Sequence, residues 1–267
     1  MTEPVRLTPS LRAKVWGRTH LEPWFPDSSE PIGEAWYLTD HELPLLVKLI
    51  FTSDRLSVQV HPDDGEDGPR GKTEMWHILE ALPDGALALG FRERITQERL
   101  REAAATGELE NLVNWMPVHP GETYFTPAHT VHAIGAGLVL CEIQQNSDVT
   151  YRLWDYGRPR PLHLEQAIPI ADLHPHPGAS KPLAVTDGRS ELVRSKHFVT
   201  ELVRLAPGEL LRPEPHICQL WIAIEGRGAI ASQPYRQGEV WLLPETGELP
   251  EIAAESATRF LRTWVPE

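Results

Sequence analysis

The chain contains 267 residues, of which 41% are hydrophobic and 24% are charged, the composition of a globular protein with a substantial core. Its 38 Asp and Glu residues exceed its 25 Lys and Arg residues, and the net charge of -13 argues against a nucleic-acid or anionic-membrane partner. No run of about 20 apolar residues occurs, and the opening MTEPVRLTPS lacks the apolar core of a signal peptide. We therefore expect a cytoplasmic protein that does not enter a membrane.

Short apolar or alternating segments predict strands throughout the first half of the chain. They are bounded by Gly, Pro or Asp and comprise residues 44–51, 56–61, 74–82, 86–91 and 137–145. One helix is predicted over residues 96–116, with Thr96 capping its start and Gly107 dividing it into two short pieces. Cys141 and Cys218 lie in apolar, strand-like runs, where buried free thiols are expected rather than a disulfide.

After Arg158 the sequence becomes rich in Pro and His, which predicts an irregular connecting segment with one helical turn around residues 164–168. Strands then resume at residues 197–205, 219–226, 228–235, 239–244 and 259–265. Strands at this spacing predict sandwiches or barrels. We expect an N-terminal domain over residues 1–160 with a short helical insert, a connecting segment over residues 161–190, and a smaller C-terminal domain over residues 191–267.

A weak internal repeat relates residues 120–134 to residues 236–249, since each runs from Gly-Glu through a hydrophobic strand to Pro and a turn. In the first copy Gly121, Pro127 and His132 match the pattern Gly-x5-Pro-x-Gly-x2-His of the cupin jelly roll, and His129 stands where Gly is usual. This turn is therefore expected to need a positive φ, which His tolerates better than most residues. The second copy lacks the final His. The repeat predicts an all-β fold of two cupin barrels with few short helices, and a metal site only in the first barrel.

The segment LSVQVH places Gln59 and His61 two residues apart on one strand, so both side chains point to the same face, about 6.6 Å apart along the chain. In metal-binding cupins a pair at this place supplies two ligands, followed by a Glu and a distant His. Glu74 and His132 are the candidates for those places, and nitrogen and oxygen donors of this kind suit Zn²⁺ best. Taken singly, each residue could be an ordinary half-buried or solvated side chain, but the shared barrel template favours a metal site.

Several longer motifs resemble one known family. LSVQVHPDD, GKTEMWHIL and HTVHAIGAGLVLCEIQQNSDVTYRLWDYGR are similar to the type I mannose-6-phosphate isomerases, specifically a short, helix-poor bacterial branch. Upstream, RAKVWGRT, IGEAWYLTD and PLLVKLI also resemble that family. The resemblance is dense over residues 12–158 and holds only in outline beyond them. It implies a zinc-dependent aldose-ketose isomerase that interconverts mannose 6-phosphate and fructose 6-phosphate through a cis-enediol.

The resemblance also implies roles for particular residues. It places four ligands of one zinc ion per chain at Gln59, His61, Glu74 and His132. It places the catalytic groups at Lys72, Glu142 and Arg152, of which Lys72 and Arg152 would also bind substrate.

The sequence itself supports an inward-facing Glu142, because Leu140, Glu142 and Gln144 share one face of an apolar strand. Glu142 is the first candidate for the base and Lys72 the second. Arg152 is expected to bind the phosphate or, alternatively, to stabilise the enediolate.

Other polar and aromatic residues are expected to have structural roles. Asp63 and Asp64 are expected to form a turn, and His77 to lie in or beside the core. His174 and His176 are expected to be solvated. The resemblance implies packing roles for two aromatic residues, Trp16 and Trp36.

Two alternative functions remain open from the sequence. One is another cupin metalloenzyme, such as an iron-dependent dioxygenase, and the other is a sugar-phosphate-binding cupin without activity. The expected partner is in each case a small molecule, and for the isomerase function it is a sugar phosphate. The chain is expected to be a monomer or a homodimer.

Overall fold

Antiparallel strands form four sheets in the computed structural model, which describes residues 3–246 and 249–266. Two of these sheets face each other in the N-terminal half. The first is ordered β2 (Thr8–Arg18), β3 (Ile32–Leu38), β4 (Leu45–Phe51), β11 (Leu138–Gln145), β6 (Glu74–Ala81) and β9 (Thr123–Thr126). The second is ordered β12 (Tyr151–Trp154), β5 (Val58–Val60), β10 (His132–Ile134), β7 (Ala86–Phe91) and β8 (Val113–Pro117).

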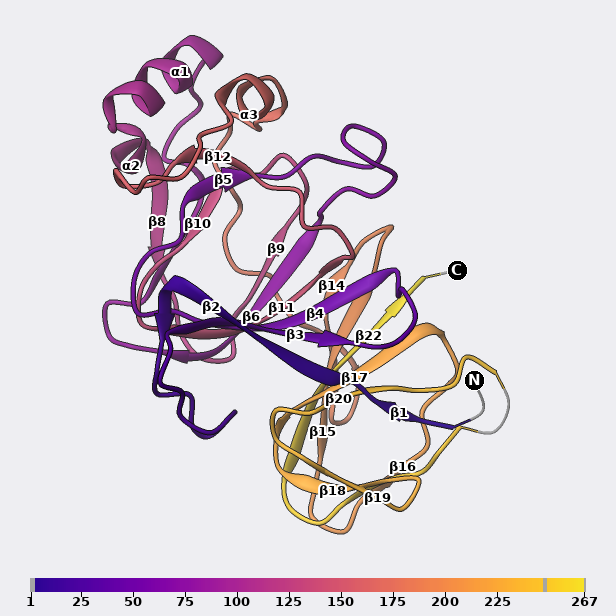
Figure 1. Ribbon diagram of the computed structural model, residues 1–267. Coiled ribbons are helices and arrows are strands. Elements are labelled where there is room, and N and C mark those ends of the chain that lie inside the picture. The colour runs from indigo at the N-terminus through magenta and orange to yellow at the C-terminus, as the bar shows by residue number, and fades with distance from the viewer. Residues whose placement is uncertain (1–2, 247–248, 267) are drawn as a thin grey trace.

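The other two sheets belong mainly to the C-terminal half (Figure 1). The larger one is ordered β1 (Val5–Arg6), β20 (Val240–Leu242), β17 (Ile217–Glu225), β22 (Thr258–Val265), β15 (Val199–Leu205), β14 (Arg189–Arg194) and β13 (Leu183–Thr186). The smaller one is ordered β16 (Leu210–Leu211), β21 (Ile252–Ala254), β18 (Arg227–Ile230) and β19 (Gln233–Arg236). Two pairs of sheets with few short helices confirm the expected all-β fold.

Apolar clusters between the layers explain why the strands stack in this order. Helices α1 (Gln97–Thr106), α2 (Leu109–Leu112) and α3 (Leu164–Ile170) cover the five-stranded sheet through one buried cluster. A second cluster lies between the five- and six-stranded sheets. A third joins the six-stranded sheet to the seven-stranded sheet, and a fourth lies between the seven- and four-stranded sheets. Central strands of the six-stranded sheet such as β4 and β11 are therefore buried on both faces, as near-continuous apolar sequences such as PLLVKLIF require.

Strand alternation gives β4 and β11 two different faces. Leu49 and Cys141 lie opposite each other and belong to the cluster that faces the C-terminal half. One residue away, Lys48 and Glu142 also lie opposite each other but point into the N-terminal barrel. Because successive strand residues point to opposite faces, both strands join a core on one side and a pocket on the other.

The predicted helix over residues 96–116 is only partly correct. Thr96 caps α1 by accepting a hydrogen bond from the Arg99 amide, and Gly107 ends it with a φ of 82°. After the short α2, however, Val113–Pro117 forms strand β8, which pairs with β7. A helical piece of four residues gains little by continuing, whereas this segment completes the edge of a sheet.

The remaining differences are additional strands and a split one. The strands not predicted from periodicity include β1, β2, β3, β12, β13, β14, β16 and β21. The predicted strand at residues 228–235 is a hairpin turning at Ala231 and Ser232, both with positive φ. The predicted helical turn is α3. Both cysteines are buried free thiols, as expected. The three-part division of the chain stays a prediction, and β1 and β13 show that the seven-stranded sheet also draws on residues before 191.

Within the described residues, no helix is long and apolar enough to cross a membrane, and the longest has 10 residues.

Candidate active site

Cross-strand pairing places polar residues of the five-stranded sheet in one row. Arg152 of β12 lies opposite Gln59 of β5, and Gln59 lies opposite His132 of β10. Residues opposite each other on antiparallel strands share a face, so these three side chains belong to one side of the sheet. His61 follows two residues after Gln59 and therefore shares that side.

The six-stranded sheet supplies a matching row from the other wall. Lys48 lies opposite Glu142, Glu142 lies opposite Trp76, and in the next inward-facing row Gln144 lies opposite Glu74. The facing sheets therefore bring two carboxylates towards the row that contains Gln59 and His132.

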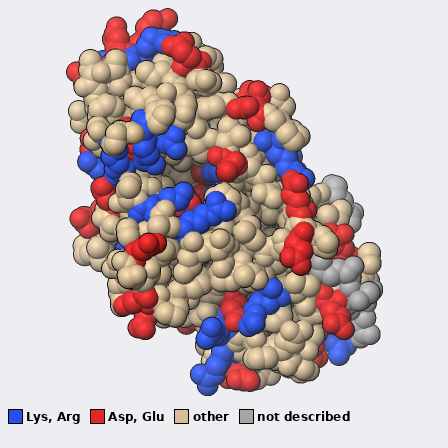
Figure 2. Space-filling view, viewed as in Figure 1, with Lys and Arg blue, Asp and Glu red and all other residues tan. Residues whose placement is uncertain are grey.

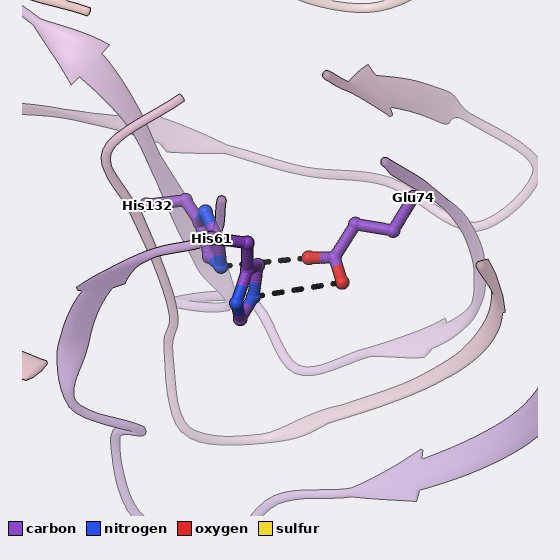
Figure 3. Close-up of side chains that lie close together, drawn as sticks. All are labelled: His61, Glu74 and His132. Carbon is purple, nitrogen blue, oxygen red and sulfur yellow. Dashed lines mark ion pairs between the residues drawn. The ribbon is translucent and has the colours of Figure 1, made fainter. Parts of the chain in front are cut away.

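His61, Glu74 and His132 converge where the two sheets face each other (Figure 3). The Nε2 atom of His61 lies 3.7 Å from Oε2 of Glu74, and the Nε2 atom of His132 lies 3.4 Å from Oε1 of the same carboxylate. The candidate ligand atoms of the three residues lie within 4.8 Å of one another. All three side chains are buried, with at most 2% of each exposed. This spacing is suitable for one shared metal ion.

Backbone contacts orient both imidazole rings. Nδ1 of His61 lies 2.8 Å from the Val149 carbonyl, and Nδ1 of His132 lies 2.8 Å from the Thr130 carbonyl. A carbonyl only accepts, so each Nδ1 carries the hydrogen and each Nε2 turns a lone pair towards Glu74. Burial, followed by the nearby Lys72 ammonium, lowers the pKa of His61 and lowers that of His132 to about 3. Both rings are therefore neutral, the form that binds metal.

The Glu74 carboxylate is only partly satisfied by the protein. Its Oε2 atom accepts a hydrogen bond from the Lys72 ammonium, but its Oε1 atom is buried without a hydrogen-bond partner in the described part of the chain. Burial raises the pKa of Glu74 above its ordinary value, even though Lys72 opposes this shift. Nε2 of His61 and Nε2 of His132 face this carboxylate, and they also contact the Lys72 ammonium at 3.0 Å and the Gln59 amide nitrogen at 3.3 Å, respectively. The donor set fits a divalent cation.

Gln59 completes the predicted set of four. Its Nε2 atom lies 3.3 Å from Nε2 of His132, and its Oε1 atom accepts a hydrogen bond of 3.0 Å from the Ser57 hydroxyl. A half-turn of the amide would exchange the two ends, because the Ser57 hydroxyl can also accept. The oxygen would then lie beside Nε2 of His132.

A pocket of about 250 Å³ opens beside this cluster, and its lining is cationic. The lining includes three acidic residues, Glu34, Glu142 and Asp148. It also includes six basic residues, Arg12, Lys14, Lys48, Lys72, Arg152 and Arg160. Six minus three leaves an excess of three positive charges, in a chain whose net charge is -13. Figure 2 shows Lys and Arg side chains gathered over the part of this face where β2 runs in Figure 1.

Lys48 is a buried lysine that sequence reasoning missed. Its ammonium donates to Oε1 of Glu142 at 2.9 Å and also to Gln144, while the Trp76 indole donates to Oε2 of Glu142 at 2.9 Å. Burial alone would raise the pKa of Glu142, but Lys48, Lys72 and these hydrogen bonds outweigh it and lower the pKa below its ordinary value. The signal was present in the sequence as a single Lys inside the apolar segment PLLVKLIF.

Comparison with known proteins shows which family this chain belongs to. No family model matches the chain. A probable mannose-6-phosphate isomerase of Bacillus subtilis is 33% identical, over 66% of this chain and 70% of that relative. The chain belongs to the mannose-6-phosphate isomerase family.

Other family members match over more of the chain. A mannose-6-phosphate isomerase of Streptococcus mutans is 29% identical over 96% of this chain and 99% of that relative. The crystal structure of the mannose 6-phosphate isomerase from Bacillus subtilis superposes with a TM-score of 0.88 at 26% identity, over 98% of this chain and 99% of that one. The fold therefore matches that of the mannose-6-phosphate isomerase family over nearly its whole length.

Two further histidines near the family motifs contact other residues and not the metal-ligand candidates. His129 has the predicted positive φ, at 73°, but its Nε2 atom pairs with Glu66 at 2.8 Å. His77 is buried, as expected, with Nδ1 at 2.9 Å from the Thr123 hydroxyl. Neither belongs to the three-residue cluster that faces the pocket of this isomerase-family protein.

Two expectations about structural residues need correction. His176 is half-buried, and its Nε2 atom lies 2.8 Å from the Phe125 carbonyl, because this part of the connecting segment packs on the barrel. Of the two histidines, only His174 is solvated. Trp36 lines the pocket instead of packing in the core, and Trp16 does both. Asp64 forms the expected turn by accepting from the Gly71 amide at 2.8 Å.

Proposed function

We propose that this protein is a zinc-dependent isomerase that interconverts mannose 6-phosphate and fructose 6-phosphate through a cis-enediol. One observation carries the proposal. In a chain of this family, two neutral imidazoles and a partly unpartnered carboxylate face one another at the side of a pocket with excess positive charge. Such a pocket suits an anionic sugar, and such a cluster suits a divalent cation.

The metal would be held by Gln59, His61, Glu74 and His132, with one zinc ion per chain. Two nitrogen and two oxygen donors are compatible with zinc. When bound, zinc supplies Lewis-acid polarisation of the substrate carbonyl and charge to offset the developing enediolate.

Residues of the chain would carry out the proton transfer. Glu142 is a buried carboxylate on the pocket wall that the metal would not use, and its lowered pKa keeps it ionised at neutral pH. We assign it the proton that leaves C2 of mannose 6-phosphate and returns to C1 of the enediol. Lys72 places its ammonium 3.0 Å from Nε2 of His61 and beside Glu74, where it can donate a hydrogen bond to a substrate oxygen.

Arg152 would bind the phosphate. Its guanidinium lines the pocket from β12, which strand β5 separates from His132 of β10, and its Nε atom is buried without a hydrogen-bond partner among the described residues. A planar guanidinium can donate two parallel hydrogen bonds to a phosphate, which suits this position. We place the reaction in the cytoplasm, where two buried free cysteines are normal, in either a monomer or a homodimer.

The decisive experiment compares zinc-loaded wild type with His61→Ala in a coupled isomerase assay, together with metal analysis. We expect the variant to lose both bound zinc and turnover, because His61 supplies one of the few ligands. His174→Ala is the matched control, since that side chain is 57% exposed and far from the cluster in sequence.

Three outcomes would contradict the proposal. If His61→Ala kept its zinc and its full rate, the proposed metal site would be contradicted. Bound iron without isomerisation would favour an oxygenase. Binding of mannose 6-phosphate with an unchanged isomer ratio would favour a binding protein without activity.

A further inference from the structure

Four of the six basic side chains in the pocket are already matched by a carboxylate. The pairs are Lys14 with Glu34 at 2.9 Å, Lys48 with Glu142 at 2.9 Å, Lys72 with Glu74, and Arg160 with Asp155 at 2.6 Å. Arg160 also donates a second bond of 2.7 Å to Asp155, so this ion pair is bidentate. The basic residues of the pocket that have no carboxylate partner are therefore the two that remain.

These two residues are Arg12 and Arg152. Neither guanidinium forms an ion pair with any carboxylate in residues 3–246 and 249–266, although both line the same pocket. The two come from the outermost strands of the facing sheets, β2 in the six-stranded sheet and β12 in the five-stranded sheet. A pair of unmatched guanidiniums across one pocket favours an anion that bears about two negative charges, such as a phosphate monoester at neutral pH.

Strand alternation directs Arg12 into the pocket. On β2, Arg12 and Lys14 line the pocket, whereas Leu11 and Val15 are exposed on the other face by 43% and 72%. Gly33 on the neighbouring strand leaves room for Lys14 on the same face, because a Cβ there would lie 2.6 Å from the Lys14 side chain. The position of Arg12 itself follows from strand alternation on the edge strand β2.

An indole ring holds Arg12 in a defined orientation. The centre of its guanidinium lies 3.5 Å from the centroid of the Trp36 ring, and Trp36 is fixed by a hydrogen bond of 3.0 Å from its Nε1 atom to Glu34. This contact uses the flat face of the guanidinium. The N–H groups point along its plane and stay available for hydrogen bonds to a ligand.

We propose that Arg12 is a phosphate-binding residue that acts together with Arg152, so that the substrate phosphate is held between the two edge strands. The identity of the sugar rests on the proposed isomerase function, but the phosphate site itself does not. This arrangement would make Arg12 a determinant of preference for phosphorylated over unphosphorylated sugars.

The test is Arg12→Met in the zinc-loaded full chain, which keeps an apolar contact with Trp36 and removes the charge. We expect KM for mannose 6-phosphate to rise by about tenfold or more with kcat within about twofold, because one charge-assisted contact is lost. Inorganic phosphate, titrated by calorimetry, should bind more weakly by a similar factor. Arg101→Met is the matched control, because Arg101 lies on α1 and pairs with Glu165.

Arg12→Lys tests the geometry and remains informative if the Met variant does not fold. It keeps the charge but loses the planar donor pair, so KM should rise by only about a few-fold. Unchanged KM and unchanged phosphate affinity in either folded variant would overturn the proposal and leave Arg12 as a packing partner of Trp36. Arg12-dependent phosphate binding in a protein without isomerase activity would support the phosphate site and refute the proposed function.

Discussion

The pairing of Lys48 with Glu142 shows how one buried contact can set the chemistry of the pocket. Both side chains are almost fully buried, and the carboxylate receives hydrogen bonds at both oxygens. Removing one partner of such a pair leaves an uncompensated buried charge, which typically costs several kcal/mol. The cheapest response of the remaining carboxyl is to take up a proton.

We therefore predict that Lys48→Met shifts the acid limb of the kcat/KM profile to higher pH. In the wild type the lowered pKa keeps Glu142 ionised, so protonation of this group does not limit the rate until the solution is strongly acidic. Without Lys48, burial raises the pKa, and the base is lost nearer neutrality. The measurement is kcat/KM across acid and neutral pH for both proteins.

A stability measurement separates this effect from misfolding. Lys48→Met should lower the free energy of unfolding by about 3 kcal/mol, whereas Lys48→Met combined with Glu142→Gln should recover most of it, since no charge is left unpaired. The double variant should stay inactive. An acid limb that does not move in a folded Lys48→Met protein would remove Glu142 as the base.

At the scale of elements, the loop between β5 and β6 positions two site residues at once. Its end is fixed where Gly71 donates a hydrogen bond of 2.8 Å to Asp64 and lies so close to Asp63 that a Cβ would come within 2.5 Å of that backbone. Lys72 and Glu74 follow immediately. Glycine is therefore required at position 71 by close approach of the backbone.

Gly71→Ala is predicted to lower kcat/KM by about a hundredfold, because a displacement of about 1 Å at the site has costs of that order. Zinc content should fall as well, since Glu74 moves with the loop. Gly65→Ala is the control from the same loop, where no atom lies within 4 Å of the new Cβ and only local backbone strain is added. Equal rates for the two variants would count against this role for the loop.

The elements also show how far sequence reasoning reached. Alternation on β5 was enough to place Gln59 and His61 on one face, and the family motifs supplied Glu74 and His132 as partners. Lys48 and Arg12 could not be recognised in the same way. The partner of Lys48 lies 94 residues away, and the pairing depends on the register of β4 against β11, which periodicity within a single strand does not contain.

At the scale of the whole molecule, the two halves share one apolar core. The cluster between the six- and seven-stranded sheets takes Leu49 and Cys141 from the N-terminal half and Phe198 and Leu220 from the C-terminal half, all at most 2% exposed. β1 adds to this connection by pairing with β20. The predicted domain division therefore describes successive parts of the sequence that share a core. We do not expect the two halves to unfold independently.

Differential scanning calorimetry should show a single cooperative transition for the full chain. Chelation of the proposed zinc ion should lower its midpoint, because a ligand that binds only the folded state stabilises it by about 4 kcal/mol at about a thousandfold excess over Kd. Two separate transitions would contradict the shared core. A midpoint temperature that stays unchanged when a chelator is added would contradict the metal site.

Strands β4 and β11 have a practical implication for engineering. On each strand, alternate residues point to opposite faces. One set places charged side chains in the pocket, and the other places apolar side chains in the cluster that faces the C-terminal half. A library that varies only pocket-lining positions would leave the backbone under those positions unchanged. Randomising buried residues such as Leu49 and Cys141, which lie on the opposite face of the same strands, would shift the backbone that carries the pocket residues. It offers a separate route to altered sugar preference.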